Sequence, residues 1–294
     1  MAVKKAFAAS LISLIVFAGA ALHAENLIFS GTPAAGKNFL CTFSIRKNVS
    51  RKMEIRGAEN PPVQEQITDF YLSGKLQIRE RNSRALLFQF TLNSFSWLNG
   101  DQKQTIEDTK IIDVALDTAG KLRLCKYARE DDSAIGAGDV PPALQSALLQ
   151  LGRSLLTGAN DVLGPDSNRN VGDFWTANDQ LIHALAKNRK ISPVEKNDWD
   201  SKVLFTRKET FFQTPVNRID FNLITNRIPG YDCRINMTYL FPVDSPETTG
   251  AISYLLDWME CVDKIMPDNN PVFSGTKIVE VMTMTIRRDL VPLR

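Results

Sequence analysis

The chain has 294 residues, of which 44% are hydrophobic and 23% are charged, with 35 basic residues against 33 acidic ones. This composition is typical of a globular protein and excludes a collagen-like or wholly disordered chain. The length is enough for one large domain or two smaller ones with a buried core.

The first 24 residues have the pattern of a secretory signal peptide. Lys4 and Lys5 form a basic head, residues 6–22 carry no charge, and small residues accumulate toward Ala24. These features predict cleavage after Ala24, with cleavage after Ala20 as the alternative. An uncleaved anchor helix would be near its lower length limit, since a membrane span needs about 17–25 apolar residues. We therefore expect an exported protein, periplasmic or extracellular, with no integral membrane segment after cleavage.

Cleavage would leave a mature chain with balanced charge and one histidine. Removing Lys4 and Lys5 lowers the basic count from 35 to 33, equal to the acidic count, and His183 remains after the loss of His23. Interleaved charges of both signs give no basic face for nucleic acid. A single histidine excludes a multi-histidine zinc site, and we expect no metal and no cofactor. No spacing identifies a pair of catalytic carboxylates, so we predict that the protein is not an enzyme.

Residues 25–138 predict an N-terminal β block. Apolar and polar residues alternate over 39–45, 75–79, 88–93, 112–116 and 122–124. Alternation with period two is typical of antiparallel strands that bury one face. Turn residues at 81–84 and 117–120 lie between alternating segments and predict two hairpins.

Residues 139–158 predict one amphipathic helix. Asp139 can cap this helix, Pro141 lies in its first turn, and Gly158 follows its last turn. Leucines spaced by three or four residues give the helix one apolar face. These leucines are Leu144, Leu148, Leu151 and Leu155.

Residues 159–294 predict a C-terminal β block. Alternation recurs over 203–205, 219–223, 233–241 and 282–287. Residues 252–266 fit a helical stripe as well as an alternating strand, and we favour a strand because strands surround them and Pro267 follows. The predicted fold class is mostly β: an antiparallel curved sheet or half-barrel in two β blocks, with one helix between them. The two blocks form either one continuous domain or two sheets.

Two short segments resemble ligand-binding loops but lack essential residues. Residues 31–37 have the glycine and lysine spacing of a P-loop, but Asn38 replaces the required Ser or Thr, and a strand follows where a P-loop needs a helix. Residues 166–177 begin like a calcium loop, but Val171 and Ala177 replace its glycine and its final glutamate. We expect both segments to be turns.

A turn carrying Val171, Gly172 and Asp173 is followed two residues later by Trp175. This turn and the order of the elements resemble a group of uncharacterised exported bacterial proteins. Those proteins have a β block, a helix led by proline, a Val-Gly-Asp-x-Trp turn and a second β block. Their layout is similar to that of the lipoprotein-carrier (LolA-like) half-barrels, whose curved sheet cradles acyl chains. The resemblance implies lipid binding and carries over no catalytic residue.

Four cysteines remain after cleavage, and no two have the spacing of a redox or zinc motif. In an oxidising compartment such cysteines are predicted to form structural disulfides. Among the three connectivities we favour Cys41–Cys125 and Cys233–Cys261, because each bridge stays within one β block. Burial without pairing is the alternative.

The predicted sheet carries more apolar side chains than one helix can cover. Met and aromatic side chains on a concave face suit a pocket for flexible apolar chains. The candidate ligand-binding residues are Phe88, Phe90, Leu92, Ile235, Met237, Tyr239, Met282 and Met284. We predict a non-catalytic exported protein that binds an apolar small molecule or lipid. The alternative is a structural or interaction module that binds an envelope protein, and closure of the two β blocks on each other would leave no pocket.

Overall fold

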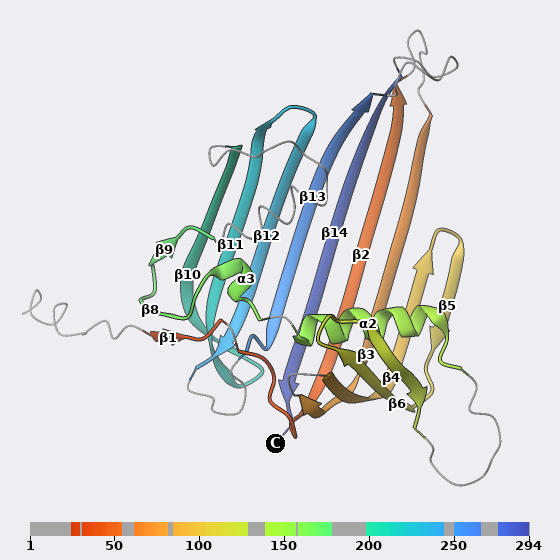
Figure 1. Ribbon diagram of the computed structural model, residues 1–294, viewed down its shortest axis with the longest axis vertical. Coiled ribbons are helices and arrows are strands. Elements are labelled where there is room, and N and C mark those ends of the chain that lie inside the picture. The colour runs from red at the N-terminus through yellow and green to blue at the C-terminus, as the bar shows by residue number, and fades with distance from the viewer. Residues whose placement is uncertain are drawn as a thin grey trace, which may run out of the picture.

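The computed structural model of the protein describes residues 25–29, 31–54, 62–81, 85–128, 139–156, 158–177, 198–243, 250–265 and 276–293. These residues form one large antiparallel sheet that is curved and unclosed, with two helices on one of its faces (Figure 1). The predicted fold class is therefore confirmed. His183 lies outside the described residues.

The large sheet has 12 strands in the order β7-β6-β4-β3-β2-β14-β13-β12-β11-β10-β9, and β5 pairs with β4 beside this path. Its strands are β2 Asn38–Glu54, β3 Val63–Arg81, β4 Ala85–Asn99, β5 Gln102–Ile106, β6 Lys110–Asp117, β7 Leu122–Tyr127, β9 Phe174–Trp175, β10 Trp199–Phe211, β11 Thr214–Ile228, β12 Tyr231–Pro242, β13 Ser253–Ile265 and β14 Lys277–Pro292. The short strands β1 Glu25–Leu27 and β8 Ser167–Arg169 form a separate pair. The helices are α2 Pro142–Leu156 and α3 Asn160–Leu163. Within the described residues, no helix has the length and apolarity that a membrane span requires.

The last strand of the chain joins the two predicted β blocks. β14 pairs with β2 along its whole length, from Lys277 opposite Glu54 to Pro292 opposite Phe39. The hydrogen-bonded sheet is therefore continuous from the N-terminal strands to the C-terminal ones. Residues 253–265 form a strand, as predicted, because β12 and β14 supply partners on both of its edges.

The sheet has one apolar face, which we call the inner face, and one polar face. In β2, for example, Phe39, Cys41 and Phe43 are buried, whereas Leu40 between them is exposed. The two helices lie against the inner face (Figure 1). The period-two alternation of the sequence thus becomes a division between core and solvent.

Two hydrophobic clusters fill the space between the inner face and the elements that cover it. The first lies under α2, whose Leu144, Leu148, Leu151 and Leu155 pack against β2, β3, β4 and β6. The second lies under α3 and β1, where Leu27, Phe29 and Leu163 pack against β10, β11 and β12. α2 begins at Pro142, within the predicted helix.

The turn before Trp175 is a structural joint. The backbone N–H of Asn170 donates to the Asp173 carboxylate at 2.8 Å, and Gly172, with a φ of 96°, donates its N–H to the carbonyl of Phe205. Trp175 donates its indole N–H to the Leu163 carbonyl at 2.7 Å. These bonds hold β9 at the edge of the sheet and attach α3 to it.

The P-loop-like segment is a turn, as predicted, whereas the calcium-like segment contains the short strands β8 and β9 on either side of a turn at Val171 and Gly172. Gly36 has a φ of 78°, and β2 follows immediately, so no helix N-terminus is available for a phosphate. The Asp166 carboxylate accepts a hydrogen bond from the backbone N–H of Phe29 at 2.7 Å. It therefore attaches the N-terminal segment to the start of β8.

Candidate functional site: a cavity on the inner face of the sheet

A cavity of about 290 Å³ lies between the inner face and the junction of the two helices. Its walls on the helix side come from the last turns of α2, from Gly158 and Ala159, and from Val162 in α3. The cavity occupies the region between the two hydrophobic clusters, because α2 covers one cluster and α3 covers the other.

The floor of the cavity consists of two cross-strand rows on β12, β13, β14 and β2. The first row is Met237, Leu256, Ile286 and Ile45. The second row is Tyr239, Tyr254, Arg288 and Phe43. Seven of these eight side chains are apolar or aromatic. Side chains directly opposite on neighbouring strands are close enough to form a continuous surface. Arg288 is the charged member of the floor.

Arg288 is only 4% exposed and connects the sheet to the helix junction. Its Nη1 donates to the carbonyl of Ser154, and its Nη2 donates to the carbonyl of Ala251 at 2.8 Å. The guanidinium carbon lies 4.9 Å from the ring centre of Tyr254. Arg81 donates to the carbonyls of Leu155 and Leu156 in the same way. Both arginines therefore satisfy the orphan carbonyls at the C-terminus of α2, where a cation is favourable.

Burial determines the charge state of the cavity floor. It raises the pKa of Tyr239 and of Tyr254 above the ordinary value of a phenol, so both are neutral hydroxyls near pH 7. It lowers the pKa of Arg288 from the usual value of a guanidinium, which still leaves this side chain protonated. Near neutral pH the floor therefore carries one positive charge in apolar surroundings.

The candidate residues named from sequence all lie on the inner face, but at different places. Met237 and Tyr239 line the cavity. Ile235 and Met284 belong to the next cross-strand row, and Met282 to the row beyond it. Phe88, Phe90 and Leu92 are fully buried in the cluster under α2 and do not line the cavity.

The sequence analysis missed most of the floor, including Phe43, Tyr254, Leu256 and Arg288. Alternation identified the apolar residues as buried but could not say which strands would be neighbours. A more specific indication was present at Arg288. Arg288 follows Met282, Met284 and Ile286 at the same two-residue spacing. Side chains at this spacing share one face of a strand, so the sequence itself places a charge among apolar residues of the inner face.

The two predicted disulfides are wrong, because none of the four cysteines, all of which lie in the described ranges, forms a disulfide. Cys233 lies opposite Glu260, whereas Cys261 lies opposite Asp232, so the two side chains point to different faces of the sheet. Cys41 is in β2 and Cys125 is in β7, with β3, β4 and β6 between them. The structure instead agrees with the alternative, in which the cysteines are buried or half-buried without forming disulfides. Alkylation of the unfolded, unreduced protein should therefore modify four thiols.

The buried thiol of Cys41 predicts a loss of stability at alkaline pH. Burial raises the pKa of Cys41 from 9.0 to about 12. Below pH 9.0 the thiol is protonated in both states, whereas above it the unfolded chain loses a proton that the folded chain retains. Between about pH 9 and pH 12 the free energy of unfolding should therefore fall by about 1.4 kcal/mol per pH unit from this residue. Urea unfolding at a series of pH values measures the slope, and the Cys41→Ala variant should have a smaller one. Equal slopes would contradict this prediction.

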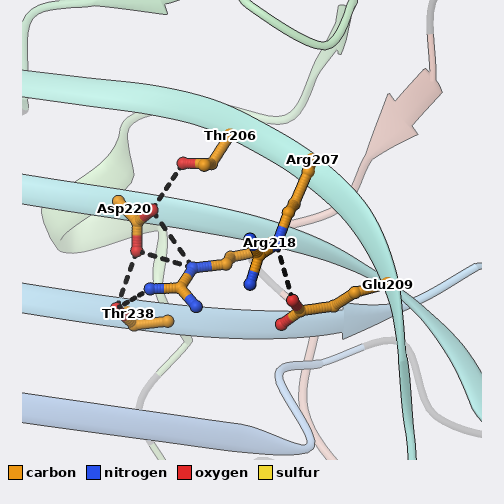
Figure 2. A network of polar contacts seen from close by, with 6 residues as sticks. All are labelled: Thr206, Arg207, Glu209, Arg218, Asp220 and Thr238. Atoms are coloured by element: carbon orange, nitrogen blue, oxygen red, sulfur yellow. Dashed lines mark hydrogen bonds and ion pairs between the residues drawn. The ribbon is translucent and has the colours of Figure 1, made fainter.

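On the polar outer face, side chains of neighbouring strands form hydrogen bonds and ion pairs with one another. Asp220 accepts hydrogen bonds from Thr206 at 2.5 Å, from Thr238 at 2.7 Å and from the Nε of Arg218 at 3.1 Å. Figure 2 shows how these side chains meet across neighbouring strands. Nearby, Arg207 pairs with Glu209 at 2.8 Å. We assign this cluster to cross-strand stabilisation of β10, β11 and β12. No three His, Cys, Asp or Glu side chains of the described ranges are arranged to hold a metal ion.

These features define the protein as one large, curved, open antiparallel sheet with a mostly apolar cavity between its inner face and two helices. No family model matches the chain. No curated protein matches it either. The resemblance to lipoprotein-carrier half-barrels therefore stays a prediction.

Similarity to solved structures is low. The chain is similar to lipovitellin, from a structure described by its lipid–protein interactions, with 10% identity and a TM-score of 0.32 over 89% of this chain and 26% of that chain. It is also similar to DynF of the dynemicin biosynthesis pathway of Micromonospora chersina, with 8% identity and a TM-score of 0.16 over 90% and 88% of the two chains. It is similar as well to P47 from Clostridium botulinum A2, with 7% identity and a TM-score of 0.18 over 86% of this chain and 82% of that chain. The chain thus spans about a quarter of the lipovitellin chain.

Proposed function

We propose that the protein is an exported, non-catalytic binding protein that holds an apolar chain in the cavity on the inner face. The observation that supports this proposal is the cavity floor, in which seven of eight side chains are apolar or aromatic. Ligand sites are typically concave and mostly apolar, with a few polar groups that fix orientation. A volume of about 290 Å³ is at the lower end of the usual range, which favours a single-chain ligand.

Filling the cavity should weaken this binding. Ile286 lies in the first row of the floor, so the Ile286→Trp variant places an indole where the ligand would lie. We expect a fluorescent fatty-acid analogue to bind delipidated wild-type protein and to bind this variant at least about tenfold more weakly, because the apolar contact area is lost. Fluorescence titration measures both affinities.

Thr283→Trp is the matched control, since Thr283 is on the same strand and is exposed on the outer face. Circular dichroism and thermal unfolding establish that both variants are folded. Equal affinity of the two variants would contradict the cavity as the site. Absence of binding to the delipidated wild-type protein would contradict the proposed function and favour an interaction module of the cell envelope.

A further inference from the structure

The charged residues that line the cavity indicate the chemistry of the ligand, provided that the cavity binds an apolar chain as proposed. Among the described residues that line the cavity, two are arginines, Arg153 and Arg288, and none is acidic. Arg153 is on the exposed side of α2, where its Nε also donates to the carbonyl of Gly120 at 3.0 Å. Arg288 is in the floor and is buried. The cavity thus has apolar walls and an excess of positive charge.

Arg288 has hydrogen-bonding capacity that the protein does not use. A guanidinium has five N–H groups. Two of those of Arg288 donate to the carbonyls of Ser154 and Ala251, and a third lies within 3.3 Å of the Ser154 hydroxyl. Its Nε is buried and has no hydrogen-bond partner. A buried donor without an acceptor costs free energy, and more so when it is charged.

Among the described residues, no carboxylate on the inner face forms an ion pair with Arg288, and Glu260, which is buried on that face, lies three cross-strand rows away. Its strand neighbour Asp289 points to the other face, where it accepts hydrogen bonds from Ser253 at 2.6 Å and from Arg287 at 2.8 Å. Directly opposite Arg288 on the inner face are Tyr254 and Phe43, neither of which carries a negative charge near neutral pH. Buried charges in proteins are normally paired, because leaving one partner of such a pair unmatched is strongly destabilising.

We infer that the ligand is a single-chain amphiphile with a carboxylate headgroup, and that Arg288 binds this headgroup while the chain occupies the apolar rows of the floor. The carboxylate supplies the negative charge that the cavity lacks. A guanidinium binds a carboxylate through parallel N–H donors, which fixes the orientation of the ligand as well as its charge. The carbonyl groups at the end of α2 hold the arginine in place for this contact.

Three ligands with the same chain test this inference by isothermal titration: dodecanoate, dodecanol and dodecylamine. We expect wild-type protein to bind dodecanoate at least about tenfold more tightly than dodecanol, since a hydrogen bond to a charged group is worth that much. Dodecylamine should bind most weakly, because its charge repels Arg288. Acetate, which has the headgroup without the chain, should not displace dodecanoate.

The Arg288→Met variant should bind dodecanoate no more tightly than it binds dodecanol, so the preference for the carboxylate is lost. Thr283→Met, on the outer face of the same strand, is the matched control. Equal wild-type affinities for dodecanoate and dodecanol would overturn the inference, and this comparison needs no substitution if Arg288→Met does not fold. A preference for dodecanoate that survives in folded Arg288→Met would overturn it as well. Binding of none of the three ligands would instead overturn the proposed function.

Discussion

Replacing Gly74 with valine is expected to destabilise the protein by more than about 3 kcal/mol, which is at the upper end of overpacking effects. A Cβ atom at Gly74 would lie 2.2 Å from the backbone carbonyl oxygen of Thr91 and 2.7 Å from the ring of Phe90. The carbonyl belongs to the neighbouring strand and cannot move without breaking the ladder. Valine adds two further methyl groups to this contact.

The cost at Gly74 follows from an irregularity in the strand pairing at this position. β4 pairs with β6 from Ala85 to Leu92 and with β5 from Phe95 to Asn99, so one strand serves two partners. The register of β3 against β4 shifts between Ser73 and Gly74. At this irregularity the ring of Phe90 lies over the glycine, in the place that a side chain would take.

Urea unfolding of Gly74→Val against the wild type measures the loss. Lys75→Val is the matched control, because Lys75 is the next residue of the same strand and is exposed on the outer face. This control should change the free energy of unfolding by less than about 1 kcal/mol. If both variants lost the same stability, the close approach at Gly74 would not be the cause.

The second large effect is expected at Gly152 in α2, where leucine should destabilise the protein by about 3 kcal/mol. A Cβ atom at this position would lie 2.7 Å from Leu116 and 3.1 Å from Phe88. Both side chains are at most 1% exposed, and side chains in a close-packed core cannot move without displacing their neighbours. The larger residue would therefore lift the helix from the sheet and expose the first hydrophobic cluster.

Ser146→Leu is the control for the helix, since it introduces the same side chain on the exposed face of α2. We expect a change of less than about 0.5 kcal/mol for it, as for most surface substitutions. Gly152→Leu should also enhance the binding of a dye that reports exposed apolar surface. Unchanged stability of Gly152→Leu would show that α2 does not need the close contact at this glycine.

The sequence by itself determined the class of the fold, because alternation needs no knowledge of which strands are partners. Residues such as Phe39, Cys41 and Phe43 must share a face in any strand that contains them. The same reasoning identified α2, since its leucines recur at helical spacing and a proline precedes them. Local geometry is sufficient for both results.

Only the tertiary structure decided the strand order and the cysteine pairing. The pairing of β14 with β2 joins residues more than two hundred positions apart, and no local pattern encodes that register. Cys233 and Cys261 are close along the ladder, yet the register places them on opposite faces. A prediction based on distance along the chain could not detect this difference of one residue.

The cavity was also decided by tertiary structure. Its floor combines two residues from each of four strands, and its position depends on where α2 ends and α3 begins. Alternation could assign Met237 and Tyr239 to an inner face, but it could not distinguish them from Phe88 and Phe90, which α2 covers. Arg288 was visible in the sequence as a charge at a position of its strand that continues a run of apolar residues. The role of Arg288 depends on the groups that folding brings near it, because burial and charge pairing are properties of the packed molecule.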